Sequence, residues 1–172
     1  MPETLATNSP ESARDFLMRF PVIAKSVSSG VGLAPHPDQI DESVIPLLVG
    51  APTVLQRMVV ASADLRVVTV GRRAWIWRRE RVEGAPIDWR LSDPTGSGFR
   101  YSRFEELEDL AISVTAELGL TTSVQDWALD KDSLPWFLEA NPVGQWLFLE
   151  GAEETVAPAV AAYLANVDRG MS

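Results

Sequence analysis

Residues 136–146 read WFLEANPVGQW, and the architecture of the whole chain can be argued outward from this segment. It opens with large apolar and aromatic residues, which favour a buried β-strand. Pro142 and Gly144 then end the strand and begin a loop. Glu139 and Asn141 stand two residues apart, so on a strand both side chains point to the same face. A carboxylate and an amide at the end of a buried strand require a partner, because burying either alone is costly.

The preceding strand-like segment supplies a candidate partner in Asp126. The polar residues between the two segments are typical of a turn, and together the segments predict a hairpin centred between Asp132 and Ser133. This hairpin places Asp126 opposite Glu139, where two carboxylates repel unless a positive charge offsets them. Two carboxylates and the amide oxygen of Asn141 form a ligand set suited to Mg²⁺. The alternative is a solvated hairpin with ordinary surface acids.

The composition excludes several classes of function. The 172 residues are 46% apolar, which is enough for one domain or two small lobes with a core. A net charge of −9 argues against nucleic acid as the main partner. The absence of cysteine excludes disulfides, thiolate zinc sites and cysteine nucleophiles. The single histidine, His36, lies in a proline-flanked loop and cannot form a multi-histidine metal site. Without a signal peptide or a long apolar run, we expect a cytoplasmic chain that does not enter the membrane.

Hydrophobic periodicity predicts three helices, at about residues 10–19, 101–118 and 155–167. Ser9 is expected to cap the first and Ser102 the second. Strand-like segments include residues 64–71 and 74–79, which read as a hairpin. The arginines at residues 72–81 could meet phosphates or acidic side chains, and the alternative is the solvated face of a strand.

A short strand at residues 22–26 carries Lys25 and leads into a Gly-rich segment at residues 26–32. Loops of this kind expose backbone N–H groups that can bind phosphate. The segment is not a Walker loop, because no Gly-Lys-Ser/Thr closes it. A flexible connector is the alternative interpretation.

Several motifs, in their order along the chain, resemble those of one enzyme family. FLEANP at residues 137–142, followed by GQW at 144–146, resembles the closing motif of ATP-grasp ligases, closest to the branch that modifies ribosomal peptides, the graspetide or microviridin-type maturases. The other matching segments are the Pro-x-Thr entry at residues 2–8, Asp-Leu-Arg at 64–66 and Asp-Trp-Arg at 88–90. The resemblance implies an α+β, ATP-grasp-like fold with antiparallel sheets and packed helices in two small lobes. Residues 1–60 would form the lobe with the lysine strand, and residues 61–172 the larger lobe with the metal hairpin.

The same resemblance implies a site for ATP and Mg²⁺. The metal ligands would be Asp126, Glu139 and Asn141, and Arg66 and Arg90 would offset charge on the transferred phosphoryl group. Asp64 is expected to orient Arg66 through a charge-assisted bond, with a structural ion pair as the alternative. The nucleotide-binding candidates are Lys25, Ser29, Gly30 and Gly32, together with the adenine hinge at Gln56, Arg57, Met58 and Val59. Arg57 and Met58 depart from the family pattern, in which an acidic and an aromatic residue are common.

By this resemblance the chain is an ATP-dependent carboxylate ligase that works through an acyl phosphate and modifies a ribosomal peptide or a small carboxylate substrate. Family members carry an N-terminal α/β domain before the Pro-x-Thr segment, so the resemblance implies a fragment, a split enzyme whose partner chain supplies that domain, or a degenerate relative. The alternative is a non-catalytic ATP-grasp-like module that binds peptide or nucleotide, or an accessory subunit of a complete ligase. A homo-oligomer is compatible with either reading, and the acceptor and the bond formed, amide or ester, stay open.

Overall fold

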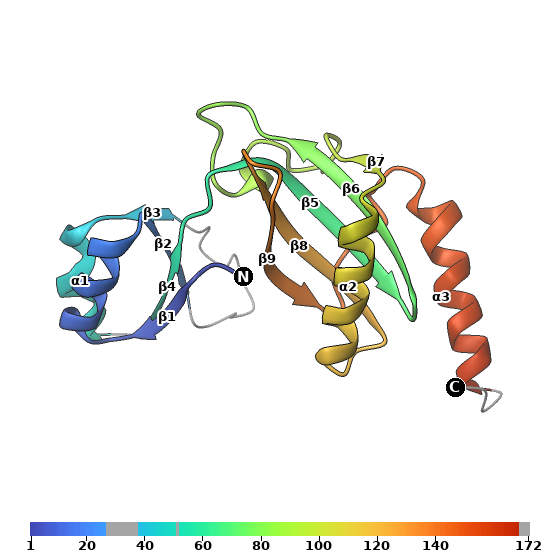
Figure 1. The fold of residues 1–172 in the computed structure, drawn as a ribbon, viewed down its shortest axis with the longest axis horizontal. Coiled ribbons are helices and arrows are strands. Elements are labelled where there is room, and N and C mark those ends of the chain that lie inside the picture. The colour runs from blue at the N-terminus through green and yellow to red at the C-terminus, as the bar shows by residue number, and fades with distance from the viewer. Residues whose placement is uncertain (27–37, 51, 169–172) are drawn as a thin grey trace. The chain divides into compact units, whose positions relative to one another are not determined.

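A computed structural model describes residues 1–26, 38–50 and 52–168 (Figure 1). The chain divides into two compact units. The first comprises Met1–Val60 with Pro86–Asp88, and the second comprises Ala61–Ala85 with Trp89–Ser172. Each unit contains an antiparallel sheet with helices packed on it. The expected α+β class is therefore confirmed.

The first unit is built on a sheet in the order β1-β4-β2-β3. Its elements are β1 (Thr4–Thr7), α1 (Pro10–Arg19), β2 (Val22–Ser26), β3 (Asp38–Ile40), the 3-10 helix η1 (Glu42–Gly50) and β4 (Thr53–Arg57). Helix α1 begins as predicted, because the Ser9 side chain accepts a hydrogen bond from the Ser12 backbone N–H and a proline occupies the first turn. Its inner face, Ala13 and Phe16, packs with Val22, Leu48 and Leu55 to form the core of this unit.

The second unit is built on a sheet in the order β7-β6-β5-β8-β9, in which every neighbouring pair is antiparallel. Its elements are β5 (Ala61–Val70), β6 (Arg73–Glu80), the 3-10 helix η2 (Trp89–Leu91), β7 (Arg100–Ser102), α2 (Glu105–Glu117), β8 (Thr122–Asp130), β9 (Pro135–Asn141) and α3 (Ala152–Asp168). The β5–β6 hairpin turns at Gly71, whose φ of 58° lies in the left-handed region that glycine adopts without strain.

The two long helices of this unit cover opposite faces of its sheet. Leu107 and Ala111 of α2, which crosses the sheet in Figure 1, pack against a cluster that includes Val67. Val156 of α3 packs against a cluster that includes Val68 and Trp77. Because neighbouring strand residues point to opposite faces, the strand alternation alone separates these two cores.

A buried polar network fixes strand β8 to helix α2. Gln125 is fully buried, and its Nε2 donates to the Ala111 carbonyl at 2.9 Å and to Thr115 Oγ1 at 2.8 Å. Its Oε1 accepts from Trp127 Nε1 at 2.9 Å. Gln125 and Trp127 therefore face α2, and Asp126 between them faces the other way.

The second predicted helix begins later than expected. Helix α2 starts at Glu105, and its N-cap, Phe104, makes no side-chain capping bond. The proposed cap, Ser102, lies in β7, where it pairs with Ile76 of β6. Strand pairing with β6 thus overrides the local capping signal. Among the described residues, no helix combines the length and the apolarity needed to cross a membrane.

Candidate functional site

Charged side chains form a row across three strands on the α3 side of the larger sheet. Arg66 of β5 pairs in register with Asp126 of β8, and Asp126 pairs with Glu139 of β9. Asn141 follows two residues after Glu139 on the same strand and pairs with Val124. The hairpin therefore brings the two predicted carboxylates opposite each other, which confirms that part of the sequence prediction.

The hairpin has this register for a different structural reason from the one expected. Near the turn Leu129 pairs with Pro135, so the hairpin is centred on Asp132 rather than between Asp132 and Ser133. A register shift after Asp126 leaves Leu138 as an extra residue on β9, and this bulge places Asp126 opposite Glu139. The Asp130 carboxylate shapes the turn by accepting the backbone N–H groups of residues 132 and 134, both at 2.9 Å.

Arg66 is the counter-ion of Asp126. Its Nη1 lies 2.7 and 2.8 Å from the two carboxylate oxygens of Asp126, and its Nη2 donates to the Gln145 carbonyl at 2.6 Å. Burial raises the pKa of Asp126, the adjacent Arg66 guanidinium opposes that rise, and the neighbouring Glu139 carboxylate adds to it. Asp126 therefore faces a cation on one side and a second acid on the other.

The donor set fits a small hard cation. Asp126 and Glu139 offer carboxylate oxygens, the Glu139 carboxylate contributes to the raised pKa of Asp126, and a divalent cation would relieve this repulsion. Asn141 Oδ1 accepts the Val143 backbone N–H at 2.9 Å and retains a second lone pair. The described residues contain no cluster of three or more His, Cys, Asp or Glu side chains with metal-binding geometry. Among the described residues, the Asn141 amide is therefore the candidate for a third protein ligand beside the two carboxylates.

Asp64 does not orient Arg66, which corrects the sequence expectation. It is 5% exposed, and its carboxylate binds Arg79 Nη1 at 3.2 Å and Arg81 Nε at 3.0 Å. Asp64 lies opposite Arg79 on β6, whereas Arg66 lies opposite Trp77 on β6 and Asp126 on β8. The alternative interpretation of Asp64, a structural ion pair, is the one that the geometry supports.

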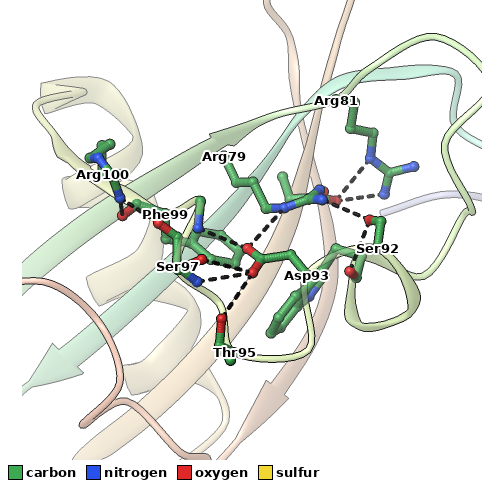
Figure 2. A network of polar contacts seen from close by, with 11 residues as sticks. Arg79, Arg81, Ser92, Asp93, Thr95, Ser97, Phe99 and Arg100 are labelled. Atoms are coloured by element: carbon green, nitrogen blue, oxygen red, sulfur yellow. Dashed lines mark hydrogen bonds and ion pairs between the residues drawn. The ribbon is translucent and has the colours of Figure 1, made fainter.

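Arg79 extends this ion pair into the loop that follows η2 (Figure 2). Its Nη2 donates to Ser92 Oγ at 2.7 Å, and its Nε lies 3.4 Å from Asp93 Oδ2. Burial alone would raise the pKa of Asp93, but hydrogen bonds from the Gly98 and Ser97 backbone N–H groups outweigh it and lower that pKa. The loop is thereby fixed next to η2. The sequence analysis offered the arginines at residues 72–81 either phosphates or acidic side chains as partners, and Arg79 pairs with two acidic side chains, Asp64 and Asp93.

Arg90, the other predicted phosphoryl-binding arginine, is exposed in η2. Its neighbour Trp89 is anchored by edge-to-face contact with Phe99 at a ring separation of 5.1 Å and by contact with Phe148. Phe148 also lies 5.9 Å from the Arg66 guanidinium carbon. Shared packing on Phe148 therefore links the segments that carry Arg66 and Arg90.

The nucleotide-binding candidates lie in the first unit. Lys25 is half-buried on β2 opposite Val54. Gln56 is 5% exposed and donates to Thr4 Oγ1 at 3.0 Å. The Arg57 and Met58 backbone N–H groups donate to the carbonyls of residues 3 and 21, at 2.9 and 2.8 Å.

The rest of that set is only partly described. Val59 is half-buried. Ser29, Gly30 and Gly32 lie outside the described residues.

Several solved structures with a similar fold are ATP-grasp ligases associated with ribosomal peptides. A RiPP-associated ATP-grasp ligase from Chryseobacterium gregarium, in complex with ADP and a leader and core peptide, superposes with a TM-score of 0.85 at 20% identity, covering 96% of this chain and 55% of that one. The macrocyclase MdnC from Microcystis aeruginosa MRC, bound to the precursor peptide MdnA, gives 0.76 at 22% identity over 96% of this chain and 55% of MdnC. The ATP-grasp ligase PsnB, complexed with minimal precursor, Mg and ADP, gives 0.73 at 20% identity over 98% and 54%.

These similarities show the fold and confirm the resemblance to ATP-grasp ligases that was drawn from the motifs. The chain spans about half the length of these solved structures, 54 or 55%. No protein-family model and no curated protein matches the sequence significantly.

Proposed function

We propose that the chain is part of an ATP-dependent carboxylate ligase that modifies a peptide. The observation that carries the proposal is the opposition of Asp126 and Glu139 on β8 and β9, with Asn141 two residues further on. This oxygen-only set lies on a fold whose solved examples include ATP-grasp ligases bound to ADP and precursor peptides. Asp126, Glu139 and Asn141 would hold Mg²⁺, which would supply charge neutralisation at the ATP phosphates.

The proposed reaction runs in two transfers. An oxygen of the substrate carboxylate attacks the γ-phosphorus of ATP, the bond from that phosphorus to the bridging oxygen breaks, and ADP leaves. The product is an acyl phosphate. An amine or a hydroxyl then attacks its carbonyl carbon, inorganic phosphate departs with the carbon–oxygen bonding pair, and the nucleophile loses a proton. No protein nucleophile is needed, which is compatible with a chain that lacks cysteine.

The arginines of the larger unit would handle the phosphate charge. Arg66 and Arg90 would donate to the transferred phosphoryl group, where negative charge is spread over its oxygens. Both approach from segments packed on Phe148, one from β5 and one from η2. Arg79 and Arg81 stay bound to Asp64 and fix the strand and loop around them.

The small lobe, residues 1–60, would bind the nucleotide, and the larger lobe, residues 61–172, would carry the metal hairpin. Lys25 and the segment with Ser29, Gly30 and Gly32 would contact the phosphates. The backbone of the hinge, Gln56 to Val59, would receive the adenine. The N-terminal domain expected from the family would come from a partner chain, and the substrate would be a peptide side-chain carboxylate.

One observation favours a second candidate, a non-catalytic module that binds peptide or assists a complete ligase. In the hinge the Arg57 and Met58 N–H groups already donate to backbone carbonyls of the same unit. Adenine recognition would then depend on the remaining backbone groups of the hinge.

Calorimetry and thermal unfolding with ATP and Mg²⁺ distinguish the two candidates. A ligand at a hundredfold excess over its Kd stabilises the folded state by about 2.7 kcal/mol, which corresponds to a rise in Tm of about 5–10 °C for a chain of this size. The ligase proposal expects this rise in the parent and its loss in Asp126→Asn and Glu139→Gln. Asp132→Asn, which removes an exposed acid from the turn of the same hairpin, is the matched control and should keep the rise. An unchanged Tm in the parent, or equal rises in all variants, would favour the module.

A further inference from the structure

The contacts of Arg66 suggest a role beyond phosphate binding. Its Nη1 is nearly equidistant from both oxygens of Asp126, at 2.7 and 2.8 Å. A carboxylate held this way already has its charge compensated by a cation. Mg²⁺ binds carboxylate oxygens at about 2.0–2.1 Å, so a metal on the same group would place its charge directly beside the guanidinium.

We propose that Arg66 keeps a bare divalent cation off Asp126 until nucleotide phosphates draw the guanidinium away. The inference rests on the proposed function, because it uses the same metal site. Arg66 is then a positioning residue whose release from Asp126 couples metal binding to nucleotide binding. The cation would enter mainly together with the nucleotide.

A move away from Asp126 could pair a donor that Arg66 leaves unsatisfied in its present position. Its Nε is buried without a hydrogen-bond partner among the described residues. Its remaining contacts are the Gln145 carbonyl at 2.6 Å and the Phe148 ring at 5.9 Å. A buried donor left unpaired costs free energy, so a second position that satisfies Nε would compensate for breaking the contact with Asp126.

Arg79 provides the contrast on the same face of the sheet. All of its nitrogens have partners, at Asp64, Ser92 and Asp93. Asp64 lies opposite Ala128 on β8, so it has no second acid facing it as Asp126 has. Removing Arg79 takes one of two guanidinium partners from Asp64, which keeps Arg81, and it creates no pair of facing acids, which makes it the control for Arg66.

Arg66 also offsets the repulsion between Asp126 and Glu139. Burial and the Glu139 carboxylate both disfavour the charged form of Asp126, and the guanidinium opposes them. Without a cation from either source, two acids would face each other across β8 and β9. Arg66 thus allows Asp126 and Glu139 to keep their positions on the hairpin before a divalent cation binds.

The test is isothermal calorimetry of the full chain with Mn²⁺ alone, as a probe for Mg²⁺, at about pH 8. We expect Arg66→Met to bind Mn²⁺ at least about tenfold more tightly than the parent, because the competing charge is gone. Arg79→Met should leave the affinity of the parent unchanged. Arg66→Met combined with Asp126→Asn should lose the gain, which would assign the bound cation to Asp126. Circular dichroism verifies that each variant is folded, and if Arg66→Met is not, Arg66→Gln replaces it with the same expected gain.

The outcomes separate this inference from the proposed function. Equal or weaker Mn²⁺ binding by a folded Arg66 variant overturns the inference, whether or not the parent binds ATP with Mg²⁺. An equal gain in Arg79→Met also overturns it, because the effect would then be general electrostatics. If ATP with Mg²⁺ does not stabilise the parent while Arg66→Met gains Mn²⁺ affinity, the ligase proposal fails and the competition at Asp126 stands.

Discussion

Replacing Gln125 by leucine tests how strand β8, which presents Asp126, is held against α2. Gln125 is fully buried and is the acceptor for the Trp127 indole N–H at 2.9 Å. Leucine fills a similar volume but leaves that N–H buried without a partner, which costs about 1–3 kcal/mol. The other partners keep alternatives, because Thr115 Oγ1 donates to the Ala111 carbonyl and lies 2.9 Å from Ser123 Oγ. We therefore expect a loss of about 2 kcal/mol, dominated by one orphaned donor.

Urea unfolding of four proteins measures this loss as a double-mutant cycle. The set is the parent, Gln125→Leu, Trp127→Phe and the double variant. Phenylalanine removes the indole N–H, so the double variant contains no orphaned donor and should be more stable than the sum of the single losses predicts, by about 1–2 kcal/mol. The exposed Gln145→Leu serves as control and should change stability by less than about 0.5 kcal/mol.

Additive losses, or a neutral Gln125→Leu, would refute the reasoning. The Trp127–Gln125 bond would then contribute nothing to the attachment of β8 to α2. The face on which Asp126 points would have to be fixed by the apolar contacts of the strand alone. Either result is read directly from the fitted free energies of unfolding, provided that the urea dependence is unchanged across the set.

Further predictions concern the hairpin and the ion pairs around it. Gly144→Ala should destabilise the fold by about 1–3 kcal/mol in urea unfolding, because an added Cβ would lie 2.6 Å from Val124 Cβ. An unchanged free energy of unfolding would mean that the loop backbone shifts to make room for the methyl group. Hydrogen bonds from the Trp136 indole and the backbone lower the pKa of Asp130, so its stabilising contribution is complete above the unfolded pKa of about 3.9 and falls as pH drops through the folded value. The difference in Tm between parent and Asp130→Asn should therefore shrink on acidification below about pH 4, and a constant difference would contradict this. Asp64→Ala should lower the free energy of unfolding by about 3 kcal/mol, because Arg79 and Arg81 would lose their shared carboxylate. A loss under about 1 kcal/mol in thermal or urea unfolding would show that other acceptors replace Asp64.

Local rules predicted the elements that depend on neighbouring residues. Ser9 and Pro10 define the start of α1, and the structure begins that helix where they indicate. The polar turn after Asp130 predicted a hairpin and the opposition of Asp126 and Glu139. The bulge at Leu138 was not predicted, because it compensates for a turn whose centre depends on how the Asp130 carboxylate binds backbone N–H groups.

The sequence by itself determined which residues share a face: Asp64 and Arg66 are two apart on one strand, and so are Glu139 and Asn141, since side chains alternate along a strand. Only the tertiary structure decided the pairing among them. Asp64 and Arg66 lie on one face of β5, which left a local bond between them open, but β5 lies between β6 and β8. The registers of those neighbours place Arg79 beside Asp64 and Asp126 beside Arg66. A buried charge pairs with the opposite charge that lies nearest across the sheet. Strand order and register decide which residue that is, and both depend on residues far apart in the chain.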